Sequence, residues 1–349
     1  MSPVPQISVT SPLGQAWLRM KLFLFQPFDL GKWFVVGFAA FLAGLGSSGN
    51  SSLEAVWNID EDWGWDRHEI SAWPESMAGF LEEVFSSLWM VGLASFLFAL
   101  ALVVAVLVIW LSSRARFVLL DNLITGQQGI TAPWRRHARL GDSLFRWQLV
   151  FTVVCLLVFG TFTAMIFLVF VPMGLLGIEG FLALPAVILL GALGFALAMT
   201  VVFVEFFLHH FVAPIMYKHQ LSTNAAWARF KTLFSMYPGW FILYGILYLI
   251  VAVVGSMALM LGGLLTCCLG LLLLMLPYIG SVVSLPLTVL QRYWDLEFLS
   301  QFGPDYELLG PVPSGSGPGS IYDDADRTVV GPEDVAEDVG GDQPGPQGA

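Results

Sequence analysis

The stretch Arg116-Phe117-Val118-Leu119-Leu120-Asp121 closes a long apolar run, and the chain then leads to Trp134-Arg135-Arg136. A similar order returns from His210-Phe211-Val212-Ala213-Pro214 to Trp227-Ala228-Arg229-Phe230-Lys231, and a shorter copy opens at Arg292-Tyr293-Trp294-Asp295. In each copy an apolar run ends in a basic residue that is followed by an aromatic one. The repetition predicts three similar units, in which each stretch is the cytoplasmic exit of a spanning helix.

The composition is that of a membrane protein. Hydrophobic residues make up 57% of the 349 residues, charged residues only 12%, and the mean hydropathy is +0.76. Soluble domains carry about 25% charged residues, so these values indicate a polytopic membrane protein. The cysteines Cys155, Cys267 and Cys268 lie in or beside apolar runs, where a disulfide framework or a thiolate metal site has no polar support. We interpret them as small packing residues.

Six apolar runs approach the length of about 20 residues that a bilayer requires, so the predicted fold is an all-α bundle of six transmembrane helices. The predicted spans are residues 28–46, 88–111, 148–170, 182–208, 240–261 and 269–290. Trp17-x-Arg19-x-Lys21 recurs as Trp227-x-Arg229-x-Lys231, and Trp134-x-Arg136 with Arg139 is a looser middle copy. The pattern predicts three parallel hairpin repeats, each preceded by an interfacial amphipathic helix. We call these three amphipathic segments the elbows; the first covers residues 13–26.

Charge is unevenly distributed and orients the bundle. The net charge of −11 is concentrated in residues 47–87, with nine acids and one Arg, and in residues 301–349, with ten acids and one Arg. A cytoplasmic N-terminus puts 14 of the 15 Lys and Arg residues on the cytoplasmic side and leaves only Arg67 outside. The positive-inside rule therefore predicts a multi-pass protein with cytoplasmic N- and C-termini.

The predicted domain organisation follows. Residues 1–12 form a loose N-terminal tail, and residues 13–300 form the membrane domain with an acidic far-side loop at 47–87. Residues 301–349 are rich in Gly, Pro and acids and have almost no apolar mass, so we expect a disordered acidic cytoplasmic tail. Such a tail offers a docking segment for a protein partner, or is simply solvated.

Glu205 is a carboxylate inside an otherwise apolar span, and it is the first candidate for function. His209 follows four residues later on the same predicted helix face, and His210 is its neighbour. An ionisable residue within a membrane indicates a pathway group, such as a proton or cation relay. The alternative is that Glu205 reaches the nearby cytoplasmic surface or pairs with His209.

The elbows are the second candidate, because each Lys or Arg near an anionic surface contributes on the order of 1 kcal/mol to binding. The candidate lipid-binding residues are Trp17, Arg19, Lys21, Arg135, Arg136, Arg139, Trp227, Arg229 and Lys231. The alternative is that these cations only set the topology. The predicted partners are membrane lipids and not nucleic acid.

Chemical motifs are scarce. A weak metal candidate is the far-side cluster of Asp60, Asp62, Asp66 and Glu69, but Gly64 and Ser71 stand where an EF-hand loop needs ligands. We interpret the cluster as a solvated acidic loop, and we expect no metal and no cofactor. The sequence has no phosphate-binding Gly-Lys-Ser/Thr loop, no His-Glu-x-x-His and no Gly-x-Ser-x-Gly, which favours a protein that is not an enzyme.

Several stretches carry a resemblance to known proteins. They are Phe25-x-Pro-Phe-Asp-Leu-Gly-Lys-Trp33, the elbow from Pro214 to Trp227, and Arg292-Tyr293-Trp294 with the following segment to Pro304. Over roughly residues 13–305 the chain resembles a family of prokaryotic six-span membrane proteins similar to the membrane domain fused to some glycerophosphodiester phosphodiesterases. The resemblance implies a six-span fold in the inner (cytoplasmic) membrane of a prokaryote. It implies no hydrolase activity, because the phosphodiesterase domain is not among the 349 residues.

Two functions follow as hypotheses. The first is a non-catalytic membrane scaffold or accessory subunit that contacts anionic lipid through its elbows. The alternative is a transporter or channel for a small solute, ion or lipid, with Glu205, His209 and His210 as pathway groups.

Overall fold

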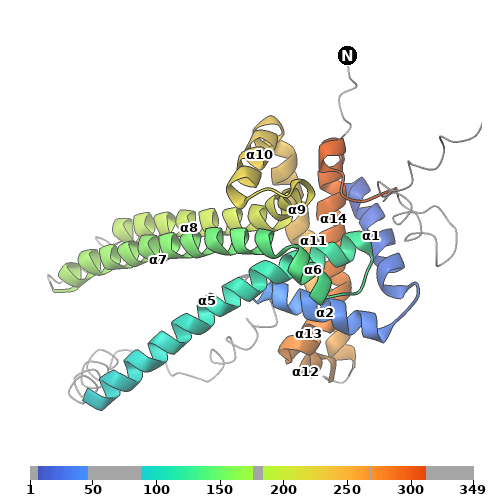
Figure 1. Ribbon diagram of the computed structural model, residues 1–349. Coiled ribbons are helices and arrows are strands. Elements are labelled where there is room, and N and C mark those ends of the chain that lie inside the picture. Colours follow the sequence, from blue (N-terminus) through green and yellow to red (C-terminus); the bar gives the residue numbers. More distant parts are fainter. Residues whose placement is uncertain (1–6, 46–87, 176–183, 267–268, 312–349) are drawn as a thin grey trace, which may run out of the picture. The chain divides into compact units, whose positions relative to one another are not determined.

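The computed structural model describes residues 7–45, 88–175, 184–266 and 269–311, and all regular elements in these ranges are helical (Figure 1). The α-helices are α1 (Thr10–Phe25), α2 (Leu30–Gly44), α5 (Leu88–Thr125), α6 (Thr131–Arg136), α7 (Ala138–Leu175), α8 (Leu184–Phe207), α9 (Ala213–His219), α10 (Thr223–Met236), α11 (Pro238–Leu265), α12 (Leu269–Met275), α13 (Pro277–Val283) and α14 (Leu285–Ser300). A π-helix, η3 (Leu208–Val212), joins α8 to α9, and a 3₁₀ turn, η4 (Pro304–Tyr306), follows α14. The all-α prediction is confirmed.

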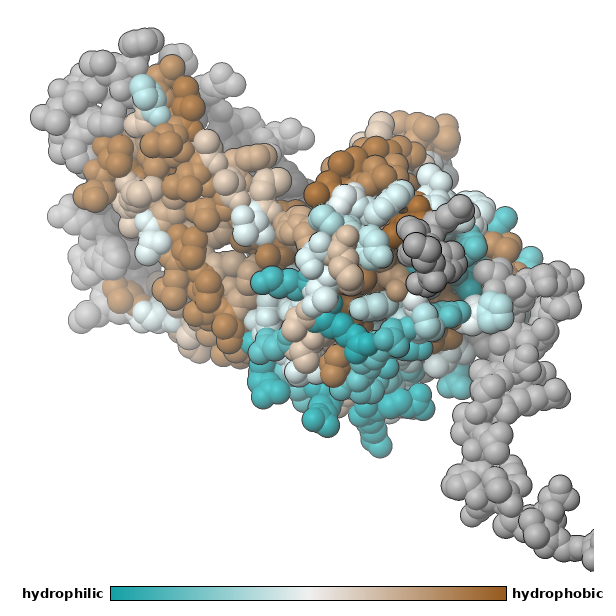
Figure 2. All heavy atoms as spheres, turned by 90° about the horizontal axis from the view of Figure 1, so that it is seen from above, coloured by the Kyte–Doolittle hydropathy of each residue, from teal (hydrophilic) through white to brown (hydrophobic). Residues whose placement is uncertain are grey.

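Four helical stretches in the described ranges are long and apolar enough to cross a membrane. They are Val91–Thr125, Ala138–Phe170, Leu184–His219 and Pro238–Leu265. Their apolar side chains face outward over most of their length; Phe98 of α5 is 72% exposed and Leu168 of α7 is 76% exposed. In Figure 2 these hydrophobic residues cover the long helices. Apolar surface of this extent is stable in lipid and not in water.

Burial changes sharply along α5. Its first half carries the exposed apolar residues, whereas Ser112, Ser113 and Ala115 are buried, as is nearly every residue from there to Leu123. The second half of α5 is thus part of a core that the shorter helices build. The repeated stretch that begins at Arg116 lies entirely in this buried half.

Helix α2 packs beside the buried half of α5. At the C-terminus of α2, the Ala43 carbonyl accepts hydrogen bonds from Ser112 Oγ at 3.0 Å and from Arg116 Nε at 3.3 Å. The end of α2 therefore lies where the apolar half of α5 stops, and α2 has only 15 residues, about 22 Å of helix. The sequence predicts a hairpin of spans 28–46 and 88–111; in the structure the end of α2 is hydrogen-bonded to α5 at Ser112 and Arg116, just past the second of these ranges.

The last predicted span, residues 269–290, is divided into α12, α13 and the start of α14. Pro277 and Pro286 stand in the first turns of α13 and α14, where the missing N–H costs nothing. Helix α14 then runs beside α11, because Gly255 lies against Leu287 and Tyr244 packs on Phe298 with a centroid separation of 4.4 Å. The prolines thus break the span into segments instead of kinking one helix.

Helices α7 and α8 run side by side in Figure 1, and a Cβ on Gly194 of α8 would lie 2.9 Å from the ring of Phe162 of α7. The core between the shorter helices is largely aromatic. Phe211 stacks on Phe230 at 5.8 Å and meets Phe241 edge-on at 5.1 Å, and all three rings are buried. Edge-to-face and offset pairs of this kind stabilise a core beyond their apolar area.

Each predicted elbow contains helix, namely α1, α6 with the start of α7, and α10. The folded unit also extends past the predicted tail boundary at residue 301, since it continues to Gly310. Gln301 exchanges two hydrogen bonds of 2.8 Å with the backbone of Ser8, and Phe302 stacks on Phe241 at 5.1 Å. These contacts tie the two ends of the described unit together.

Candidate functional site

The three repeated stretches meet at one small cavity of about 20 Å³. Its walls come from the buried half of α5, from η3 with the start of α9, and from α14. The polar side chains that line it are Arg116, His209, Arg292 and Asp295. The repetition in the sequence therefore corresponds to one place in the fold, which we treat as the candidate site.

Asp295 has three polar partners at this site. Its carboxylate accepts from Tyr244 Oη at 2.6 Å and lies 2.8 Å from His210 Nδ1. Arg292 Nη1 is 3.4 Å from Oδ2 of the same carboxylate and also donates to the His209 carbonyl at 2.9 Å. Because Asp295 is only 1% exposed, these partners replace the water that a buried carboxylate loses.

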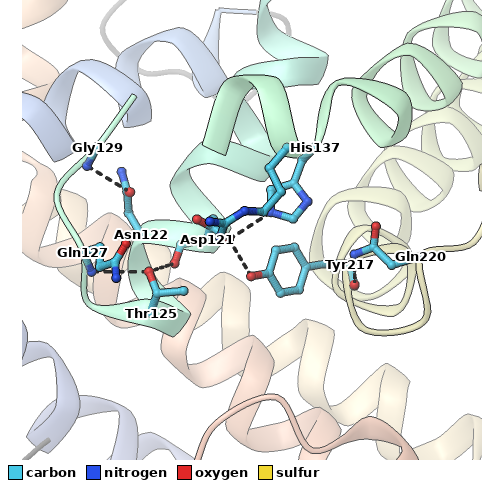
Figure 3. A network of polar contacts seen from close by, with 9 residues as sticks. Asp121, Asn122, Thr125, Gln127, Gly129, His137, Tyr217 and Gln220 are labelled. Carbon is cyan, nitrogen blue, oxygen red and sulfur yellow. Dashed lines mark hydrogen bonds and ion pairs between the residues drawn. The ribbon is translucent and has the colours of Figure 1, made fainter. Parts of the chain in front are cut away.

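A second buried carboxylate, Asp121, has the same kinds of partner. Tyr217 Oη donates to Asp121 Oδ1 at 2.7 Å, and His137 Nε2 lies 2.9 Å from the same oxygen. Figure 3 shows the two rings pointing at the carboxylate, Tyr217 from α9 and His137 from the junction between α6 and α7. Arg136 is farther, at 3.9 Å, and 60% exposed. The network therefore joins α5, the α6–α7 junction and α9 inside the core.

The two networks thus share one composition, a buried Asp with one His and one Tyr. Both carboxylates belong to the repeated stretches, since Asp121 ends the first stretch and Asp295 ends the third. Asp121 links α5 to the α6–α7 junction and to α9, and Asp295 links α14 to η3 and to α11. We conclude that these residues hold together the ends of the long helices.

Arg116 and His209 contrast with these networks because their polar atoms have few partners. Arg116 is 7% exposed, and Nη1 and Nη2 have no hydrogen-bond partner among the described residues. His209 is 8% exposed, and neither ring nitrogen has such a partner in the described part of the chain. Both side chains face the same cavity.

The three predicted pathway residues, Glu205, His209 and His210, have different surroundings in the structure. His210 belongs to the Asp295 network, and His209 lines the cavity. The i,i+4 pairing predicted between Glu205 and His209 is not formed, because neither His209 nitrogen has a hydrogen-bond partner in the described ranges. The helix widens to π geometry at Leu208, a feature that is frequent at functional sites and that changes the face on which later residues lie. Glu205 is half-buried and lies within electrostatic reach of Arg116.

Some of the predicted lipid-binding residues are engaged within the protein. Arg19 pairs with Glu297 and also donates to the Gly310 carbonyl. Arg229 forms an ion pair of 3.0 Å with Asp305. Trp227 stacks on Trp147 at 5.7 Å. Arg19 and Arg229 therefore have acidic partners within the protein, and Trp227 packs on a neighbouring helix.

The other candidate lipid-binding residues are exposed. Exposed cations are found on all three elbows: Lys21, Arg135, Arg136, Arg139 and Lys231. Trp17 is 50% exposed, and Lys21 Nζ lies 5.7 Å from its ring centroid. Figure 2 shows hydrophilic residues gathered over the part where the shorter helices pack, apart from the apolar surface of the long helices.

Helices α8 and α10 also enclose an apolar pocket of about 250 Å³. Phe203, Phe207 and Phe234 line it, and Lys231 lies at its wall. Phe203 is 48% exposed on the apolar length of α8, so the pocket adjoins the surface that faces lipid.

The weak metal candidates of the far-side loop, Asp60, Asp62, Asp66 and Glu69, lie outside the described residues. Within the described ranges, no group of three or more His, Cys, Asp or Glu side chains is arranged to hold a metal ion.

Sequence reasoning singled out the stretches that contain Asp121 and Asp295 but assigned no role to the two acids. It missed their partners His137, Tyr217 and Tyr244. A signal was present, because each acid closes a repeated stretch that an Arg opens. The partners carry no signal, since they come from other segments.

The fold and the apolar surfaces define the chain as an all-helical membrane protein. A family model described as "Family of unknown function (DUF7544)" matches residues 7–271, and the chain belongs to this family. No curated protein and no solved structure matches the chain.

Proposed function

We propose that the protein is a non-catalytic membrane scaffold or accessory subunit whose elbows bind anionic lipid. The observation that carries the proposal is the set of exposed cations on three separate elbow helices, all packed on one folded core. Lys21 extends from α1, Arg135 from α6 and Lys231 from α10. Cations in this arrangement hold a protein against the negative surface of the cytoplasmic leaflet.

The apolar pocket between α8 and α10 adds a second contact with lipid to the proposal. Aromatic walls of this kind accept an acyl chain, and Lys231 at the wall supplies a positive charge for the phosphate. The pocket adjoins the exposed apolar length of α8, so an acyl chain reaches it from the bilayer.

The finer topology belongs to the same proposal. Four long helices cross the membrane, and α2 with α12 and α13 supply the first and sixth spans of three parallel hairpins. Both termini are cytoplasmic in the inner membrane of a prokaryote, because that orientation puts the elbow cations inside.

The relationship to the membrane domain fused to some glycerophosphodiester phosphodiesterases rests on the Phe25–Trp33 and Pro214–Trp227 stretches. The acidic residues beyond 311 offer a docking segment for a protein partner.

The lipid proposal is tested by lipid retention on the full-length protein. Native mass spectrometry after purification in mild detergent compares bound phosphatidylglycerol with phosphatidylcholine. We expect enrichment of the anionic lipid, and each of Lys21→Gln, Arg135→Gln and Arg139→Gln lowers it about fivefold, the equivalent of about 1 kcal/mol.

Lys218→Gln is the matched control for these variants. Lys218 is exposed and lies on α9, not on the amphipathic helices α1, α6 and α10 or the start of α7, and its ammonium donates to the Glu307 carbonyl. Equal retention of both lipids by the wild type, or an equal loss in Lys218→Gln, contradicts the elbow proposal.

A transporter of small solutes or ions is the second candidate function. The cavity beside His209, with Glu205 in electrostatic reach of Arg116, favours it because it puts ionisable groups at the end of a long apolar helix. Reconstituted wild type and Glu205→Gln are compared in a flux assay over candidate ions. Identical flux from both proteins, or none from either, argues against a pathway through Glu205.

A further inference from the structure

We propose that the cavity where the three repeated stretches meet binds a monoatomic anion of the size of chloride, held by Arg116, His209 and Arg292. This site uses none of the exposed elbow cations, so it stands apart from the lipid-binding proposal. Its ligands come from α5, η3 and α14.

Arg116 is the central ligand. Its Nε donates to the Ala43 carbonyl at 3.3 Å, which leaves the two terminal nitrogens with up to four N–H groups. Neither terminal nitrogen has a hydrogen-bond partner among the described residues, although the side chain is only 7% exposed. Buried charges in proteins are paired and hydrogen-bonded, and a guanidinium keeps its charge. The cavity is the place where such a partner fits.

His209 and Arg292 complete the set of donors. A neutral imidazole carries one N–H, and both nitrogens of His209 are buried without a protein partner in the described ranges. The Arg292 guanidinium lies against the same cavity and is fixed there by the His209 carbonyl at 2.9 Å. Two cations and a ring N–H thus point to one small space.

The acidic groups around the cavity decide how much positive charge is left for a ligand. Asp295 is engaged by Tyr244 and His210 and lies 3.4 Å from Arg292. Glu205 is the other acid within electrostatic reach of Arg116, and it is half-buried on the preceding helix. Glu205 is therefore the natural competitor of a bound anion for Arg116.

The volume of the cavity limits the class of anion that it can hold. The cavity measures about 20 Å³, and one water-sized sphere needs roughly 10–15 Å³. A halide fits such a space, whereas the five heavy atoms of sulfate or phosphate do not. N–H groups from two guanidinium ions and an imidazole match a spherical anion, which demands no directed acceptor geometry.

The test is thermal unfolding of the full-length protein in detergent micelles, with sodium chloride, bromide, sulfate or gluconate at one fixed ionic strength. Constant ionic strength removes differences in general screening, and the part of a shift that belongs to the cavity is the part that the variants below remove. We expect chloride and bromide to raise the Tm of the wild type above the gluconate value by about 3 °C or more. Sulfate stabilises proteins generally by exclusion from their surface, so its effect should be equal in the wild type and in Arg116→Gln. Equal Tm values in chloride and gluconate overturn the proposal.

Four variants identify the site. Arg116→Gln removes the central donor and should abolish the halide increment. If this variant fails to fold, Ala213→Val serves in its place, because Ala213 lines the cavity and the added methyl groups fill it while every donor stays. Arg146→Gln removes an exposed cation elsewhere on α7 and should keep the increment. Glu205→Gln removes the competing carboxylate and should lower the halide concentration at half-effect severalfold.

Two further outcomes contradict the site. One is a halide increment that survives in Ala213→Val, because the anion then binds elsewhere. The other is a smaller increment in Glu205→Gln, because Glu205 would then assist and not compete. An anomalous bromide peak between Arg116 and Arg292 in a crystal would locate the ion directly, and a water at that position would overturn the proposal.

Discussion

Tyr244 and Asp295 form a hydrogen bond of 2.6 Å between two side chains that are 0% and 1% exposed. The bond joins α11 to α14, and removal of the hydroxyl leaves a buried carboxylate with one donor fewer. Tyr244→Phe should therefore lower the free energy of unfolding by about 1–3 kcal/mol, measured as a loss of Tm in detergent. Tyr248→Phe is the control, because Tyr248 is one turn away on α11 and packs on His210 through its ring, at 4.5 Å. Equal losses in both variants would show that packing, and not the hydrogen bond, sets the effect.

The Asp121 network predicts energetic coupling between residues from two different helices. Tyr217 and His137 both contact Oδ1 of Asp121, at 2.7 Å and 2.9 Å. In a double-mutant cycle of Tyr217→Phe and His137→Ala, we expect a coupling free energy of about 0.5–3 kcal/mol, because the two donors share one acceptor. Additive effects on unfolding would mean that each residue acts independently of the carboxylate.

Close packing of α2 against α13 gives a third prediction. A Cβ on Gly37 would lie 2.7 Å from Cγ2 of Val282 and 3.3 Å from its Cα, so Gly37→Ala forces the two helices apart. We expect a loss of about 1–3 kcal/mol in unfolding free energy, and recovery of part of it in the double variant with Val282→Ala. Gly92→Ala is the control, because a Cβ there meets nothing within 4 Å and Ala favours helix by about 0.5–1 kcal/mol. A loss in Gly92→Ala as large as that in Gly37→Ala would remove the steric explanation.

The sequence predicted the helical class and the four long apolar helices well, because an apolar run that spans a bilayer is a local property. It also marked the stretches at Arg116, His210 and Arg292, which the fold brings together. It did not predict their convergence, because no local pattern encodes which helices pack at their ends. The partners of Asp121 and Asp295 depend on that packing, so only the structure reveals them.

Two departures from the sequence prediction have local physical causes. Pro277 and Pro286 each begin a new helix, which divides the predicted sixth span. The π-helix at Leu208 breaks the i,i+4 alignment on which the pairing of Glu205 with His209 depended. A sequence shows where a proline lies, but it does not show whether that proline ends a helix or only kinks it. A short π-helix has no comparable sequence signal.

The folded part of the C-terminal segment leads to the last prediction. Phe302 stacks on Phe241 at 5.1 Å, Leu309 is 8% exposed, and Gln301 exchanges two hydrogen bonds with Ser8. Deletion of residues 301–349 should therefore lower the Tm by about 5 °C or more, since burial of one large apolar side chain contributes roughly 1.5–3 kcal/mol. Deletion of residues 311–349 keeps all these contacts and removes a segment rich in Gly, Pro and acids, so it should leave the Tm within about 1 °C of the full-length value. Both deletions are compared in the same detergent. Equal losses would place the stabilising contacts beyond Gly310, against the structure.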